Sequence, residues 1–130
     1  MRKSIENLSG RKYTGGRLNA SRTRRKYEID RYPNEPIVGP EITITRRVRG
    51  NNQKTAIKSI DFINVNNKEN KKTVKTKIIR ALKNSANKDY ERRGVLSKGA
   101  VVETELGSVR IVSRPGQNGT MNGILVKESN

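Results

Sequence analysis

This 130-residue chain lacks the side chains that carry most enzyme chemistry. It has no His and no Cys, which removes the commonest general base, thiolate nucleophiles and Cys/His zinc sites. Ser and Thr hydroxyls are plentiful, but there is no His to activate one. Asp61 and Asp89 do not have the spacing of metal ligands. We therefore expect no enzymatic activity, no bound metal and no cofactor.

One pair of carboxylates, Glu103 and Glu105, has a spacing that could support chemistry. Two residues apart on a strand, they would lie on one face, and such a pair can perform acid–base work on a glycoside. We instead expect them to face solvent as ion-pair partners of Arg110 or Arg114 on the adjacent strand. The pair therefore predicts a cross-strand contact rather than an active site.

Lys and Arg are the abundant charged residues of the chain. There are 29 of them against 12 Asp and Glu, a formal net charge of +17, whereas small domains usually hold about 2–8. Residues 1–31 carry a net +7 and residues 32–98 a net +10, while residues 99–130 are balanced. Each cation that neutralises a phosphate releases counterions. The charge therefore predicts salt-dependent binding to a nucleic acid.

Two cationic motifs lie in the first quarter of the chain. Gly15 and Gly16 would let the backbone approach a phosphate, and their N–H groups would suit an anion-binding nest. The alternative is a flexible linker, but the flanking cations favour the phosphate site. In residues 22–27, the Arg guanidinium groups can bind two phosphate oxygens at once. The planar Arg and Tyr side chains can also stack on unpaired bases. A nuclear-localisation signal or an anionic-lipid patch would look similar.

Cations continue beyond these motifs onto the predicted strands, and Lys75 and Lys77 are two of them. A localisation signal would not need cations on the strands, so we expect RNA to contact both the N-terminal segment and the folded domain. The predicted contact residues are Arg11, Lys12, Tyr13, Thr14, Gly15, Gly16, Arg17, Arg22, Arg24, Arg25, Lys26, Tyr27, Arg46, Arg47, Arg49, Lys54, Arg92, Arg93 and Lys98.

Apolar residues predict a scaffold of short strands for these cations. Hydrophobic residues make up only 31% of the chain and are concentrated after Ile37, so the first third is too polar to fold alone. We expect an all-β fold: a small antiparallel β-barrel of about six strands at residues 37–130, joined to an extended basic arm at residues 1–36 that is disordered when free. Strands are predicted over residues 41–48, 54–65, 73–82, 100–106, 109–113 and 123–127.

Two local features complete this expectation. Residues 50–52 predict a turn between the first two strands. A short helix is expected between Asn84 and Arg93, capped by Asn84 or Ser85 and ended by Gly94.

Several motifs in order resemble one protein family. Residues 11–18 (RKYTGGRL) and 24–28 (RRKYE) look like the signature of the archaeal and eukaryotic small-subunit ribosomal protein eight. The similarity continues through residues 48–52, 84–87, 98–100, 103–107 and 113–117. The compact length resembles the archaeal form. Where the family usually has Leu-Gly, this chain has Ile29-Asp30, and the charge of Asp30 disfavours a close phosphate contact there.

The resemblance implies a structural, RNA-binding protein of the small ribosomal subunit. Its partners would be 16S-type rRNA and neighbouring small-subunit proteins, with the chain a monomer within the ribosome and cytoplasmic. No small-molecule substrate and no membrane are implied. The alternative is a non-ribosomal nucleic-acid-binding protein, such as a chromatin-coating or RNA-processing subunit. A membrane-binding arm is disfavoured because the arm offers few apolar residues.

Overall fold

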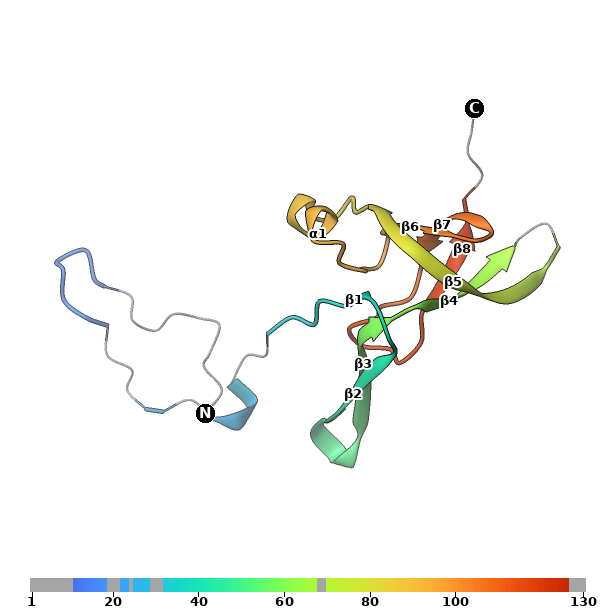
Figure 1. Ribbon diagram of the computed structural model, residues 1–130. Helices are drawn as coiled ribbons and strands as arrows, with labels where there is room; N and C mark the ends of the chain where they lie inside the picture. Colours follow the sequence, from blue (N-terminus) through green and yellow to red (C-terminus); the bar gives the residue numbers. More distant parts are fainter. Residues whose placement is uncertain (1–10, 19–21, 24, 29–31, 68–69, 127–130) are drawn as a thin grey trace. The chain divides into compact units, whose positions relative to one another are not determined.

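The structure is a computed structural model that describes residues 11–18, 22–23, 25–28, 32–67 and 70–126. Its residues divide into two compact units, residues 1–33 and residues 34–130. The second unit contains all the strands labelled in Figure 1 and the helix α1. It is mostly β-structure, which confirms the predicted all-β class.

A tight hairpin occupies residues 11–17 of the first unit. Arg11 and Arg17 form an antiparallel bridge, the Lys12 N–H donates to the Gly16 carbonyl at 2.8 Å, and the Gly15 N–H donates to the Lys12 carbonyl at 2.9 Å. Gly15 has φ +83°, the left-handed conformation that closes a three-residue hairpin loop. A single 3₁₀ turn, η1 (Lys26–Glu28), follows later in this unit. Within this unit, the described residues thus contain a local hairpin and one 3₁₀ turn.

Five strands of the second unit close into a barrel: β4 (Phe62–Asn67), β5 (Lys72–Lys83), β6 (Val101–Thr104), β7 (Gly107–Ile111) and β8 (Asn122–Leu125). Successive strands pair antiparallel, as predicted. The barrel closes between β8 and β4, and this last pair is parallel. The expected barrel is thus confirmed, with five strands and one parallel seam.

The other three strands, β1 (Ile37–Val38), β2 (Ile42–Arg47) and β3 (Gln53–Ile60), form a separate small sheet in the order β1-β3-β2. The prediction of one strand over residues 54–65 is therefore wrong. The chain bends at Asp61, whose backbone carbonyl accepts a hydrogen bond from the Ile78 N–H at 2.7 Å. This contact with β5 ends the pairing with β2 and begins the barrel.

A single hydrophobic core joins the small sheet to the barrel. Ile57 and Ile60 of β3 are buried against residues that point into the barrel. Because both sheets share this core, the base of the β2–β3 hairpin is anchored. The core residues are Ile57, Ile60, Ile63, Val65, Ile78, Leu96, Ala100, Val102, Val109, Ile111 and Met121.

The short helix α1 (Lys88–Arg92) lies within the predicted range. Its first turn is capped by Asn87, whose side chain accepts a hydrogen bond from the Asp89 N–H at 2.8 Å. Gly94, with φ +66°, follows the last turn as predicted. The expected cap at Asn84 or Ser85 is wrong because the chain makes a further turn before the helix begins.

Asn84 instead has a buried structural role at the end of β5. Its side-chain amide donates to the Val95 carbonyl at 3.2 Å and to Ser97 Oγ at 2.8 Å, and its side-chain oxygen accepts from the Ala86 N–H at 3.1 Å. Its own N–H donates to Glu91 of α1 at 3.0 Å. These bonds fasten β5 to α1 and to the segment that follows the helix.

Gly123 of β8 faces a part of the barrel interior that has no room for a side chain. A Cβ there would overlap Val109 Cγ1 and would lie 2.9 Å from Ile63 Cδ1 and 3.0 Å from the Arg110 carbonyl oxygen. We predict that Gly123→Ala lowers the free energy of unfolding by about 2 kcal/mol, as overpacking usually does. Urea unfolding measures this change. Gly116→Ala is the control, since its Cβ would meet nothing closer than 3.6 Å; equal losses in both variants would contradict the prediction.

Candidate RNA interface

The β2–β3 hairpin carries four predicted contact residues away from the barrel (Figure 1). Arg46 lies opposite Lys54 and Arg47 opposite Gln53, with Arg49 in the connecting turn η2 (Arg49–Asn51). The structure therefore brings Arg46, Arg47, Arg49 and Lys54 together on one projecting hairpin. The sequence predicts the turn that joins its two strands, but not that the hairpin lies outside the barrel.

The tip of this hairpin is shaped by two left-handed residues. Gly50 has φ +71° and Asn51 φ +59°, conformations that Gly and Asn adopt more readily than other residues. The Val48 N–H donates to the Asn52 carbonyl at 2.8 Å and closes the loop. The predicted turn at residues 50–52 is confirmed, and it places Arg49 at the tip.

The base of the hairpin is held by the second unit's loops. The Ile57 N–H donates to the carbonyl of buried Pro115 at 2.8 Å, and the side-chain amide of Asn34 donates to the Ile57 carbonyl. Gly119 packs closely on Thr55. The base of the hairpin is thus held in place while its tip is exposed, an arrangement that suits a cationic surface that binds a polyanion.

Like charges face one another on this hairpin without an acidic neighbour in the sequence. Residues 42–60 contain five Lys and Arg and no Asp or Glu. Arg46 and Lys54 are directly paired across the strands, and like charges in that position destabilise a sheet. An external polyanion would relieve this repulsion.

We predict that Arg46→Gln has opposite effects on stability and on RNA binding. Removing the repulsion with Lys54 should raise the free energy of unfolding by a few tenths of a kcal/mol. Losing one phosphate contact should weaken binding to small-subunit rRNA and reduce the slope of log affinity against log salt by about 0.7–0.9. Urea unfolding and filter binding measure the two quantities. Arg46→Lys, which keeps the charge, should leave the salt slope unchanged; a stability loss in Arg46→Gln would contradict the prediction.

Strand β5 adds a second row of cations that the list of predicted contacts omits. It carries Lys72, Lys75, Lys77, Arg80 and Lys83, all exposed, and no acidic residue. Lys75 lies opposite Asn64, and its ammonium lies 4.5 Å from the centre of the Phe62 ring. The signal was available in the sequence, because residues 70–83 contain six Lys and Arg and no carboxylate.

The first unit presents its predicted residues on the hairpin described above and around η1. Tyr13 and Thr14 form the exposed tip, and the Arg11 guanidinium donates to the Gly15 carbonyl at 2.9 Å. The Gly15 N–H is used within the hairpin, so it is not available to an anion-binding nest. Lys12, Gly16, Arg17, Arg22, Arg25, Lys26 and Tyr27 are also exposed, whereas Arg24 and Asp30 lie outside the described residues.

Arg92 and Arg93 of the α1 region take part in ion pairs within the second unit. Arg93 binds both oxygens of Glu35, at 2.5 and 3.1 Å, and reaches Asp89 at 2.8 Å. The hydrogen bond to Glu35 is the main cause that raises the pKa of the Arg93 guanidinium above its ordinary value. Arg92 contacts Asp89 at 3.0 Å. Arg93 thus joins the helix to the segment before β1, and much of its charge is already balanced.

The expected partner of Glu103 is wrong. Glu103 binds Arg80 of β5 at 2.5 Å, since the barrel places β5 on one side of β6 and β7 on the other. Strand β6 ends at Thr104, so Glu105 lies in the turn and does not share a strand face with Glu103. Arg110 of β7 is therefore available to another partner. Lys98, a predicted contact, is exposed beside Gly99.

No helix in the described part of the chain is long and apolar enough to cross a membrane.

The family described as "Ribosomal protein S8e" matches residues 6–126. The "Small ribosomal subunit protein eS8" of Methanocorpusculum labreanum is 44% identical over 119 residues, which cover 92% of this chain and 95% of that protein. The protein of the same name from Nanoarchaeum equitans is 48% identical over 107 residues, covering 82% and 84%.

A third relative, the eS8 protein of Sulfurisphaera tokodaii, is 41% identical over 119 residues, covering 91% of this chain and 93% of its own. The matches span nearly the whole chain, including the hairpin of the first unit and the barrel of the second. They confirm the family resemblance and, because the relatives are structural ribosomal proteins, the expectation that the chain is not an enzyme. The chain belongs to the S8e family of small-subunit ribosomal proteins.

Proposed function

We propose that this small-subunit protein binds 16S-type rRNA through two cationic regions. The first is the basic arm, residues 1–36, and the second comprises the β2–β3 hairpin and the outer face of β5. The Lys and Arg of these two regions neutralise phosphates where RNA segments approach one another. The reaction is association alone, with no bond made or broken.

The observation that carries this proposal is the hairpin of five cations without a carboxylate, in which Arg46 faces Lys54. A surface that served only solubility would mix both signs of charge. This element instead keeps its cations on a rigid base and leaves their repulsion uncompensated within residues 42–60. Such a surface is stabilised when phosphates lie between the strands' side chains.

The residue types divide the proposed contacts by geometry. Arg46, Arg47 and Arg49 offer planar guanidinium groups that bind two phosphate oxygens at once, whereas the β5 lysines act as point charges along the backbone. Phosphate contacts of this kind position the protein without reading sequence. Exposed Tyr13, at the tip of the residue 11–17 hairpin, adds an aromatic face on which an unpaired base stacks.

Neighbouring small-subunit proteins are the remaining proposed partners, with the chain present as one copy per subunit in the cytoplasm. The sign-balanced α1 network, in which Arg92 and Arg93 bind Asp89 and Glu35, suits protein contacts better than RNA contacts. Its carboxylates would repel phosphate.

The proposal is tested by measuring the binding of the full chain to a transcript of small-subunit rRNA over a series of salt concentrations. We expect a steep negative slope of log affinity against log salt, of about 0.7–0.9 per phosphate contact. A duplex DNA of equal length is the competitor, and sedimentation with small subunits through a high-salt gradient is the second readout. Equal preference for DNA, with release from the subunits, would favour the non-ribosomal alternative.

A further inference from the structure

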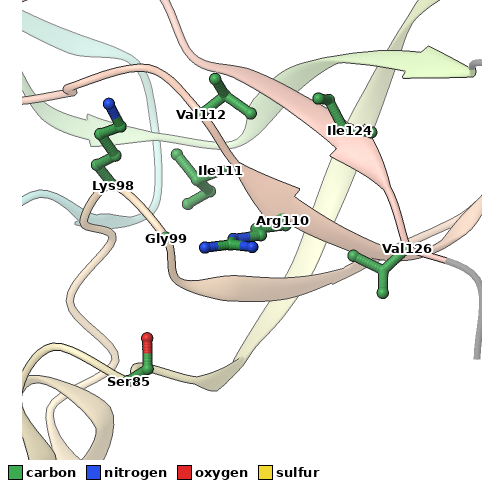
Figure 2. A pocket seen from close by; sticks show the side chains of 8 residues that line it. All are labelled: Ser85, Lys98, Gly99, Arg110, Ile111, Val112, Ile124 and Val126. Atoms are coloured by element: carbon green, nitrogen blue, oxygen red, sulfur yellow. The ribbon is translucent and has the colours of Figure 1, made fainter.

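A hollow of about 560 Å³ opens on the outer face of the barrel beside β7 and β8 (Figure 2). Its volume falls within the about 300–1,000 Å³ of small-molecule sites. The turn at Lys98 and Gly99 borders one side and Ser85 another, while β7 and β8 with the residues that follow them supply the rest (Figure 2). All of its lining residues belong to the second unit.

The wall formed by β7, β8 and the residues after them is unusually apolar for the outside of a barrel. Val112 and Val126 are 45% and 38% exposed, and Ile124 is half-buried. Outward positions of an antiparallel sheet that faces water are normally polar. These aliphatic side chains therefore offer an apolar surface that a planar, weakly polar group would cover favourably.

Among the residues that the structure describes, two cations and no carboxylate line the same hollow. Arg110 has the aliphatic residues Val101 and Ile124 as its cross-strand neighbours, and Glu103, which could have paired with it, is bound to Arg80. Figure 2 shows the Arg110 guanidinium lying in the hollow between Gly99 and Val126, with Lys98 at the rim. The site thus combines an apolar surface with positive charge that no carboxylate of the described residues neutralises.

We propose, on the basis of the rRNA binding proposed above, that this hollow holds one unpaired nucleotide of the RNA. The base lies on Ile124 and the guanidinium plane of Arg110, which are cross-strand neighbours, since Arg stacks well on unpaired bases. Val112 lies toward one end of this wall and Val126 toward the other. The ammonium of Lys98 contacts the adjoining phosphate. The Ser85 hydroxyl, on the opposite side of the hollow, is placed to hydrogen-bond the ribose or the base edge.

An acidic peptide with apolar side chains is the competing occupant, and the two differ in what they require of Arg110. A carboxylate needs only a positive charge, which Lys also supplies. A stacked base needs the planar, weakly hydrated guanidinium. The net charge of +17 further favours a polyanion as the molecule that approaches this face.

The test uses conservative exchanges in the full chain, measured by filter binding to the small-subunit rRNA transcript. Arg110→Lys should lower the affinity about fivefold or more, the loss expected when one stacked base is given up. Lys98→Arg should change it by less than about twofold, because a point contact to phosphate is kept. Arg114→Lys, the same exchange outside the hollow, is the matched control. Circular dichroism verifies that these exposed substitutions leave the fold intact.

A photo-cross-link distinguishes RNA from peptide within the assembled particle. A benzophenone amino acid at exposed Ser85, at the rim of the hollow, should link to an unpaired rRNA nucleotide in reconstituted small subunits, and Arg110→Lys should reduce the yield. Links to protein alone, or unchanged affinity in Arg110→Lys, would overturn the nucleotide site while salt-dependent rRNA binding by the parent chain persists. Absence of rRNA binding by the parent chain would overturn the proposed function itself.

Discussion

Deleting residues 1–33 is expected to lower the affinity of the chain for small-subunit rRNA by orders of magnitude and to flatten its dependence on salt. This segment carries ten of the 29 Lys and Arg, so if each neutralises one phosphate the salt slope falls by about 7–9. The second unit keeps the β2–β3 hairpin and β5. We therefore expect weak residual binding with a shallower slope rather than none, as filter binding between 50 and 200 mM salt would show.

A full-length variant separates the charge of the first unit from its length. Replacing Arg11, Lys12, Arg17, Arg22, Arg25 and Lys26 with Gln keeps the chain intact and removes six cations. Its salt slope should fall by about 4–5 and its affinity should lie between those of the parent and the deletion. An unchanged slope in both variants would sink the role of this segment. A full effect in the deletion alone would assign binding to the backbone of this segment, its tyrosines or the four Lys and Arg that the variant keeps.

The second large effect concerns folding and is expected for Asn84→Ala. Asn84 is only 4% exposed, and its side chain bonds Val95, Ser97 and Ala86. The substitution leaves the buried Val95 carbonyl and the part-buried Ser97 hydroxyl and Ala86 N–H without their partner. Each unsatisfied buried group costs about 1–3 kcal/mol, so the free energy of unfolding should fall by about 3 kcal/mol, as urea denaturation would measure.

Ser97→Ala is the matched control for Asn84→Ala. It removes a single hydrogen bond, at 2.8 Å, from the same cluster, so the expected loss is about 1 kcal/mol. The intrinsic affinity for rRNA should be unchanged in both variants at temperatures where they are folded, since Asn84 is buried. Losses of equal size would mean that the carbonyl of Val95 and the N–H of Ala86 find other partners.

Much of the fold follows from local patterns in the sequence. Several features can be understood from neighbouring residues alone. They are the alternating residues of β2, the turn at Gly50 and Asn51, the apolar residues spaced along β5, and the end of the helix at Gly94. The family motifs identify the chain, and the run of cations identifies the hairpin as a candidate interface. The contact roles of the individual Lys and Arg remain predictions.

The features that sequence reasoning missed depend on partners far along the chain. Residues 54–65 have strand propensity throughout, and only the contact of the Asp61 carbonyl with Ile78 divides them between two sheets. Likewise, Glu103 has cations available on both sides, and the ring order of the barrel gives it Arg80 rather than Arg110. Local propensity cannot choose between such partners, because strand pairing is set by packing of the whole core.

The parallel seam between β4 and β8 has a consequence for the order in which the protein matures. Asn64 pairs with Asn122 across 58 residues of chain, so the ring stays open until the last strand has been synthesised. Until then the edges of β4 and β7 are unprotected, and open edges of this kind recruit strands from other chains. The chain between β4 and β8 must also form a long loop before these two strands pair, and the entropy cost of that loop slows closure of the barrel. A nascent copy thus passes through an aggregation-prone stage that ends only with residues 122–125, and premature truncation before Asn122 would leave the chain in it.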